Sequence, residues 1–192
     1  IRLQEGVLVN LSYHQERFER TRFQELGLSS HPRLDQFIQV PDGLDQGIFK
    51  CRILYGNEIE RIEYEPYVFP QVSSLKVVYA DHIVYNYKYS KRSGLEELYN
   101  RRGACDDILI VKEGCVSDSY YANTVFWDGR DWFTPDTPLL PGTKRAYLLD
   151  QGLLQLARIT PKNLIDYLKI GLINAMNDLD EGPEVPMDKV IL

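Results

Sequence analysis

The sequence predicts an α+β protein with a small, β-rich N-terminal lobe and a larger C-terminal lobe that mixes helices and strands. Three observations support this fold class. Two strand-like runs at 48–55 and 59–64 are separated by Gly56 and Asn57, which is typical of a β-hairpin. A segment rich in proline and serine, 66–74, follows the hairpin. Beyond it, strand-like and helix-like patterns alternate along the chain.

The expected boundary between the lobes lies near Tyr79, which places 1–79 in the first lobe and 80–192 in the second. The chain has 192 residues, of which 44% are hydrophobic and 26% charged. This length is sufficient for two small lobes packed together, and the composition is that of an ordinary globular protein. The composition therefore argues against an intrinsically disordered chain.

The first lobe is expected to open with a half-buried strand at 6–11, where apolar and polar residues alternate. A helix is expected from Ser12, because serine is favoured at a helix N-cap, and Gly27 is expected to end it. The residues that supply its apolar face are Phe18, Phe23 and Leu26.

In the second lobe, short apolar runs alternate with helix-like segments. Pro161 is expected to open a further short helix near the C-terminus. The predicted strands are at 84–89, 107–111, 125–127 and 170–173, and the predicted longer helices are at 94–101 and 143–157.

Charge and composition disfavour several classes of protein. A net charge of −6 disfavours nucleic acid as the main partner, because phosphate binding needs a basic face. The chain has no run of eighteen apolar residues and no signal segment at its N-terminus, so we expect a cytoplasmic protein without membrane spans. Its three cysteines have spacings that fit neither a disulfide framework nor a zinc site, so no metal is expected.

The most informative stretch is 116–127, in which Asp118 precedes Asn123. A Thr-Pro pair and then Gly-Thr-Lys-Arg at 142–145 follow in order. Taken alone, each piece is typical of a turn, a strand end or a helix start. Their linked order resembles the class IV aminotransferase family, whose members include branched-chain and D-amino-acid aminotransferases and aminodeoxychorismate lyase.

The resemblance implies a fold type IV enzyme that uses pyridoxal 5′-phosphate (PLP), with Asp118 beside the pyridine nitrogen of the cofactor. A carboxylate at contact range keeps that nitrogen protonated, and the protonated ring then withdraws electrons from the substrate. The family usually has glutamate at this position, so the shorter aspartate changes the geometry but keeps the charge. Asn123 is expected in the same cofactor site.

The phosphate of the cofactor is expected at the start of the helix that Gly142 opens. Backbone N–H groups at a helix start bind anions, so the amides of Thr143 and Lys144 are the candidate donors. The family has Ile-Thr at these two positions, so the usual threonine hydroxyl is lost here while the backbone donors remain.

Two further phosphate contacts follow from the resemblance. Ala175 lies in an Asn-Ala-Met stretch that resembles the end of the lyase-type members, and it is expected near the phosphate. Arg17 ends a His-x-x-Arg motif that resembles the family's N-terminal motif. Its planar guanidinium suits a forked contact with phosphate oxygens.

The resemblance also requires a lysine that holds PLP as a Schiff base and moves a proton during the reaction. Lys76, Lys88 and Lys91 are the candidates. Lys88 is flanked by tyrosines, lies roughly thirty residues before Asp118, and forms with Arg92 the Lys-x-x-x-Arg pattern of lyase-like members. We therefore expect Lys88 to be the catalytic lysine. Without the resemblance, Lys88 would be interpreted as an exposed strand residue.

The activity expected from the resemblance is that of an aminodeoxychorismate lyase, which forms p-aminobenzoate and pyruvate. An aminotransferase acting on a branched-chain or D-amino acid is the main alternative, because both use the same PLP machinery. The departures from the family pattern at Asp118 and at 143–144 leave open a protein that binds PLP or a metabolite without turnover, or a chance match in a binding module without PLP. A small-molecule substrate and a homodimer are expected from the resemblance alone.

Overall fold

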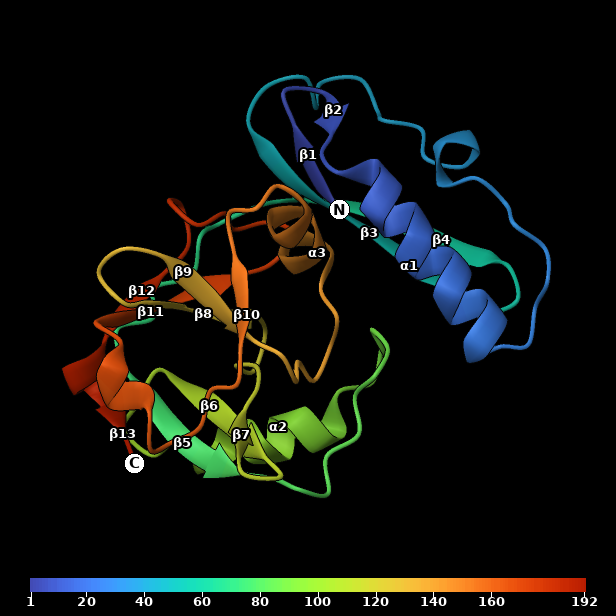
Figure 1. Ribbon diagram of the computed structural model, residues 1–192. Helices are drawn as coiled ribbons and strands as arrows, with labels where there is room; N and C mark the ends of the chain where they lie inside the picture. The colour runs from blue at the N-terminus through green and yellow to red at the C-terminus, as the bar shows by residue number, and fades with distance from the viewer. The chain divides into compact units, whose positions relative to one another are not determined.

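The structure is a computed structural model that describes residues 1–192, and it divides into two compact units, 1–68 and 69–192 (Figure 1). The α+β class is confirmed, since both helices and sheets are present. The division precedes the boundary expected near Tyr79. The reason is that β5 (Leu75–Tyr79) pairs with β6 of the second unit and not with the preceding hairpin.

The first unit is a four-stranded antiparallel sheet with one long helix. The strand order is β2-β1-β3-β4, and the predicted hairpin forms with Ile53 opposite Ile62. Phe18 of the helix packs in a core cluster with residues of both hairpin strands. The elements are β1 (Arg2–Gln4), β2 (Val7–Leu8), α1 (Leu11–Gln24), a 3-10 turn (Leu34–Gln36), β3 (Ile48–Tyr55) and β4 (Ile59–Pro66).

Two expectations for the start of this unit were wrong. The stretch 6–11 is not one strand, because Gly6 has a φ of +77° in a tight turn between β1 and β2. The helix N-cap is Asn10 and not Ser12, with a left-handed φ of 55°. Asparagine tolerates this conformation better than most residues, which explains why the chain turns into the helix there.

The buried face of α1 also differs from the expected one. His14, Phe18 and Arg22 are buried, and their spacing of four residues places them on one stripe of the helix. By contrast, the side chain of Phe23 is 63% exposed and that of Leu26 is 36% exposed. No helix of the chain has the length and apolar character that crossing a membrane requires.

The second unit contains two sheets with a shared core. One has the order β10-β9-β8-β11-β12 and the other β13-β5-β6-β7. Apolar side chains of both sheets meet in one cluster, for example Leu109 with Phe126 and Leu172. The remaining elements are α2 (Ser93–Tyr99), β6 (Asp107–Lys112), β7 (Cys115–Val116), β8 (Asn123–Trp127), β9 (Trp132–Pro135), α3 (Thr143–Asp150), β10 (Gln155–Ala157), β11 (Lys169–Ile173), β12 (Glu184–Pro186) and β13 (Val190–Ile191), with 3-10 turns at Asn100–Arg102, Leu164–Asp166 and Met187–Lys189.

The strand predicted at 84–89 does not form, and 80–92 is a loop between β5 and α2. Ile83 and Tyr85 are buried while the residues between and after them are more exposed, which produced the strand-like alternation. These two side chains pack in a cluster with apolar residues of α2, and no neighbouring strand pairs with the segment. Lys88 therefore lies on a loop and not on a strand.

The helix predicted at 143–157 ends at Asp150. Gly152 has a φ of +69°, and the N–H of Leu153 donates to the carbonyl of Leu148 at 2.9 Å, which closes the helix. The chain then forms β10, which pairs in parallel with β9. The helix expected at Pro161 is only a 3-10 turn. The other predicted elements of this unit are confirmed as α2, β6, β8 and β11.

Candidate functional site

Asp118 lies just after β7 in the second unit and is 6% exposed. Both of its carboxylate oxygens accept hydrogen bonds. The Oδ1 atom accepts from Nδ2 of Asn123 at 2.9 Å, and Oδ2 accepts from the backbone N–H of Leu140 at 2.8 Å. No lysine, arginine or histidine forms a salt bridge with Asp118. The site thus contains a buried and oriented carboxylate without a cation paired to it.

Burial raises the pKa of Asp118 to about 6. The hydrogen bonds from Leu140 and Asn123 and the positive charges of Arg145 and Lys88 act in the opposite direction and lower this pKa. The carboxyl group is therefore mostly ionised at neutral pH. A buried anion of this kind can bind a cationic group, which is a common property of functional sites.

Asn123, the first residue of β8, joins Asp118 to the loop before α3. Its Nδ2 atom donates to Asp118 and also to the carbonyl of Leu140 at 2.8 Å. Its Oδ1 atom lies 2.0 Å from the position that a Cβ atom on Gly142 would occupy. Gly142 is thus required by this close approach and not by its backbone conformation, which has an ordinary φ of −73°. The side chain of Asn123 supports the carboxylate of Asp118.

Replacing Gly142 with alanine is expected to lower the free energy of unfolding by roughly 2 kcal/mol or more, because the new methyl group overlaps the amide of Asn123. Urea unfolding measures this change. Gly56→Ala is the matched control, since its Cβ would meet only the flexible end of Glu60, at 3.2 Å. The control is expected to change stability by less than about 0.5 kcal/mol. Equal effects of the two substitutions would contradict the close approach.

The start of α3 lies beside Asn123. Thr143, Lys144 and Arg145 are all buried, and no side chain caps the helix at Gly142. Helix N-termini leave backbone N–H groups without helical partners, so an uncapped start can bind an anion. The Nζ atom of Lys144 forms a salt bridge with Asp178 and lies 5.3 Å from the centroid of the Tyr147 ring. The side chain of Lys144 is thus fixed against neighbouring residues.

The turn that contains Ala175 lies next to the same helix start. Because β11 pairs antiparallel with β8, the turn after β11 is at the end where β8 begins with Asn123. The Oδ1 atom of Asn174 closes this turn by accepting two backbone N–H groups, at 2.8 and 3.2 Å. Asp178, at the end of the turn, pairs with Lys144 of α3. The structure therefore gathers Asp118, Asn123, the start of α3 and the Ala175 turn at one end of the sheet.

Lys88 is exposed on the 80–92 loop. Its positive charge acts on Asp118, so the loop brings Lys88 toward this cluster. The loop ends at Arg92, whose guanidinium lies 4.4 Å from the ring centroid of Tyr120 and donates to its carbonyl. The ring of Tyr120 stacks on Tyr99 of α2 with a centroid distance of 4.4 Å. Arg92 thus attaches the loop to the chain just beyond Asp118.

Two further candidate residues belong to other elements of the chain. Arg17 is half-buried on α1 of the first unit, where its carbonyl accepts the hydroxyl of Thr21 at 2.8 Å, and its role at the phosphate stays a prediction. Lys76 lies on β5 and donates to the carbonyl of Leu192 at 2.6 Å. Among the three candidate lysines, Lys88 is the one whose charge acts on Asp118.

Sequence reasoning missed two groups that shape the site. The donor to Asp118 at Leu140 is a backbone N–H, which no residue type signals. The guanidinium of Arg145 acts on Asp118 from inside the unit, although Arg145 was noted only as the end of the Gly-Thr-Lys-Arg motif. A buried arginine in the first turn of a helix is a feature that helical periodicity can indicate, since it shares a face with the buried Leu148.

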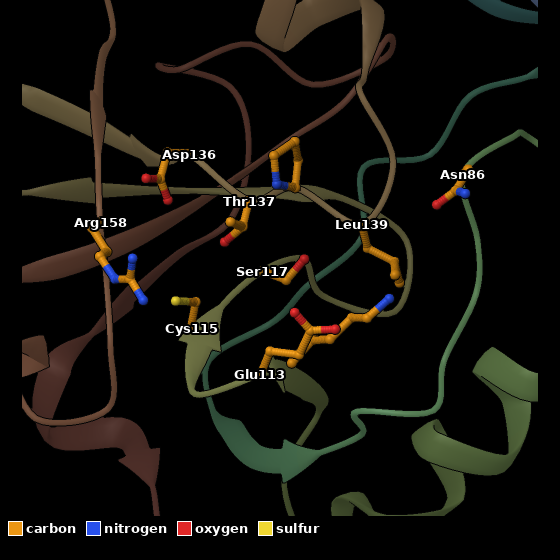
Figure 2. Close-up of a pocket in the computed structure, with 10 residues that line it drawn as sticks. Asn86, Glu113, Cys115, Ser117, Asp136, Thr137, Leu139 and Arg158 are labelled. Atoms are coloured by element: carbon orange, nitrogen blue, oxygen red, sulfur yellow. The ribbon is translucent and has the colours of Figure 1, made fainter.

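A cavity of about 490 Å³ lies in the second unit (Figure 2), and its lining includes Ser117 and Leu139, the chain neighbours of Asp118 and Leu140. Arg158 and Cys115 point toward the same space in it, and Oγ of Ser117 is buried there without a hydrogen-bond partner. None of the residues predicted for the cofactor lines this cavity. The other lining residues are Asn86, Lys112, Glu113, Asp136, Thr137, Pro138 and Leu139.

The pH dependence of stability should report the burial of Asp118. Its pKa of about 6 in the folded protein lies above the ordinary value of 3.8, so the folded protein holds the proton more tightly. The free energy of unfolding therefore falls as pH rises from about 4 to about 7, by on the order of 2 kcal/mol from this group. Urea unfolding of the cofactor-free wild type and of Asp118→Asn at several pH values measures this contribution. The difference between their free energies of unfolding should change with pH. A difference that is constant across this window would contradict the burial.

Comparisons with known proteins support the resemblance. The family model for class IV amino-transferases matches residues 93–179. An uncharacterized protein of Haemophilus influenzae is 38% identical over 179 residues, covering 92% of this chain and 95% of that protein. A crystal structure of a proposed 4-amino-4-deoxychorismate lyase from Haemophilus somnus is 35% identical, with a TM-score of 0.88 and coverage of 93% and 95%. A PLP-bound hypothetical aminotransferase from Mycobacterium tuberculosis has the same fold at 16% identity, with a TM-score of 0.70 and coverage of 91% and 75%.

Proposed function

Because the chain belongs to the class IV aminotransferase family, we propose that it is a PLP-dependent enzyme whose second unit holds the cofactor between Asp118 and the start of α3. The observation that carries this proposal is the carboxylate of Asp118. It is buried, mostly ionised at neutral pH, oriented by two hydrogen bonds and free of any salt bridge. These are the properties that the protonated pyridine nitrogen of PLP requires of its partner.

The other end of the cluster fits the phosphate of the cofactor. The backbone N–H groups of Thr143 and Lys144 lie in the first turn of α3, which has no side-chain cap. The Ala175 turn is attached to this helix start through the pair of Lys144 with Asp178. When bound, PLP supplies an electron sink for charge that develops on the substrate. Asp118 sustains that property by stabilising the proton on the pyridine nitrogen.

Lys88 is the residue that we assign to covalent attachment of the cofactor and to proton transfer. The support for this assignment is that the charge of Lys88 acts on Asp118, the proposed partner of the cofactor nitrogen. To act as a base, its amine must lose its proton, which burial and neighbouring cations favour. In the resting protein Lys88 is exposed, so its side chain is accessible to both cofactor and substrate.

The reaction that we propose is that of an aminodeoxychorismate lyase. Support comes from the crystal structure of a proposed lyase that is 35% identical and of which this chain covers 95%, and from Lys88 and Arg92 in the pattern of lyase-like members. Lys88 removes the proton from the carbon that bears the substrate amine. The bond between the ring carbon and the enolpyruvyl oxygen then breaks, and the ring becomes aromatic as p-aminobenzoate. The released enolpyruvate takes up one proton, which balances the proton removed by Lys88, and becomes pyruvate.

The direct test is incubation of the purified, PLP-loaded protein with aminodeoxychorismate. Chromatography for p-aminobenzoate and a lactate dehydrogenase assay for pyruvate should detect the two products in equal amounts. Absence of both products from a protein that binds PLP would exclude the lyase function. An unchanged cofactor spectrum on addition of any amino donor would point to binding without turnover.

An amino-acid aminotransferase is the second candidate, because the matching family model carries that activity in its name and both reactions use Lys88 and Asp118 in the same roles. Its signature is conversion of an amino acid into its 2-oxo acid in the presence of a second 2-oxo acid, without pyruvate release from aminodeoxychorismate. We also propose a cytoplasmic homodimer. Light scattering after size-exclusion chromatography measures the oligomeric state.

A further inference from the structure

Arg145 is a buried cation that forms no salt bridge. It lies in the first turn of α3 and is 8% exposed. Its Nε atom donates to the hydroxyl of Thr134 at 3.2 Å, and a terminal nitrogen donates to the carbonyl of Pro135 at 2.7 Å. Both partners are neutral. A guanidinium does not lose its proton in a protein, so its burial requires an opposite charge within electrostatic range.

Asp118 supplies that charge. Burial lowers the pKa of Arg145 from its ordinary value, and the carboxylate of Asp118 acts against this effect. Burial raises the pKa of Asp118, and the charge of Arg145 acts against that rise. Asp136 also acts on Arg145, but its side chain is exposed, so water screens it. Lys88 is the other cation that acts on Asp118; it is exposed as well, and its effect is smaller than that of Arg145. Arg145 and Asp118 are thus the buried members of this charge system.

Hydrogen bonds through two strands connect Arg145 to the backbone beside Asp118. The hydroxyl of Thr134 on β9 accepts from Arg145 and donates to the carbonyl of Thr124 on β8 at 3.0 Å. The hydroxyl of Thr124 donates in turn to the carbonyl of Ser117, which directly precedes Asp118. All of these residues are buried. The path links the guanidinium of Arg145 to the backbone that directly precedes Asp118.

We infer that Arg145 is a positioning residue that keeps Asp118 anionic without bonding to it, which leaves the carboxylate of Asp118 available to the nitrogen of the cofactor. This inference rests on the proposed function of Asp118. The guanidinium of Arg145 bonds to Thr134 and Pro135, whereas the hydrogen bonds of the Asp118 carboxylate come from Asn123 and Leu140. The charge of Arg145 therefore acts on Asp118 through space. Because Asp118 has no salt-bridge partner, its carboxylate can form a salt bridge with a cationic group of a ligand.

Two substitutions at Arg145 separate its charge from its shape. Arg145→Met removes the charge and keeps an extended side chain, whereas Arg145→Lys keeps the charge and loses the forked hydrogen bonds. Arg158→Met is the matched control, because Arg158 is an exposed arginine of the same unit whose charge is screened by water.

The first readout is the titration of the Asp118 carboxyl carbon by NMR in cofactor-free protein, assigned with Asp118→Asn. We expect the midpoint to rise by about one pH unit in Arg145→Met and to stay within about 0.3 unit of wild type in Arg145→Lys and Arg158→Met. The second readout is the Kd for PLP at pH 6, which should increase about fivefold in Arg145→Met only, because the anionic fraction of Asp118 falls from about one half to about one tenth. Unchanged titration and Kd in a folded Arg145→Met would overturn the inference.

If Arg145→Met does not fold, Arg145→Gln decides, because glutamine also removes the charge but keeps a hydrogen-bond donor for Thr134 or Pro135. A rise of the midpoint by about one unit supports the role of the charge, and an unchanged midpoint overturns it. The titration needs no cofactor, so its outcome is independent of the proposed function. A wild type that takes up no PLP would instead overturn the proposed function, whatever the titration shows.

Discussion

Replacing Lys88 with alanine is expected to lower kcat by at least about 10³-fold, measured as p-aminobenzoate formation with saturating PLP. The substitution removes the one amine that we assign both to covalent attachment of the cofactor and to proton transfer. A free amine from solvent cannot replace it efficiently, because it lacks the fixed position that an intramolecular group provides. Since Lys88 is exposed on a loop, its loss should leave the fold intact, and circular dichroism can verify this.

Lys91→Ala is the matched control for this prediction. Lys91 is an exposed lysine on the same loop, three residues beyond Lys88. Its removal should change kcat by less than about twofold, as expected for a surface substitution away from the reacting groups. Loss of activity in Lys91→Ala with retention in Lys88→Ala would transfer the catalytic role to the other lysine.

The second large effect is expected for Asp118→Asn. We predict a decrease in kcat of about 10²-fold or more and a weaker Kd for PLP, because the amide has no charge to stabilise the proton on the pyridine nitrogen. The new amide has one oxygen and one nitrogen, so its nitrogen would face one of the two donors, the N–H of Leu140 or Nδ2 of Asn123. One of the two existing hydrogen bonds would therefore be lost. Asp118→Glu, which introduces the residue usual in the family, should retain more activity than Asp118→Asn.

Asp107→Asn is the matched control for Asp118. Asp107 is also buried in the second unit, and burial likewise raises its pKa to about 6. Its Oδ1 atom accepts from the backbone of Ile108 and Tyr120, and the charge that acts on it belongs to Arg92. Both substitutions should alter stability, but only Asp118→Asn should change the absorption spectrum of the bound cofactor. The same spectral change in both variants would contradict the assignment of Asp118.

Much of the fold could be predicted from local sequence signals. The hairpin at Gly56 and Asn57 and the buried strands β6, β8 and β11 follow directly from apolar patterns and turn residues. The 84–89 segment was misassigned because burial of Ile83 and Tyr85 imitates a strand, while strand formation requires a pairing partner. The helix start at Asn10 was missed because a left-handed N-cap has no strong sequence signature.

The site was only partly predictable. The order of Asp118, Asn123 and the Gly142 helix start indicated that they act together, and the structure brings them into contact through the side chain of Asn123. The support behind them was not predictable. The donor at Leu140 is backbone, and the effect of Arg145 on Asp118 depends on how β8 and β9 pair, which local patterns do not specify.

The most direct test of the central claim is to reduce the PLP-loaded protein with borohydride and to locate the pyridoxyl group by peptide mass spectrometry. Reduction makes the bond between the cofactor and its lysine permanent, so the modified peptide identifies the attachment site. We predict a single pyridoxyl group on Lys88, together with loss of the label and of the visible absorption band in Lys88→Ala. A label on Lys91 or Lys76, or a band that persists unchanged in Lys88→Ala, would contradict the assignment.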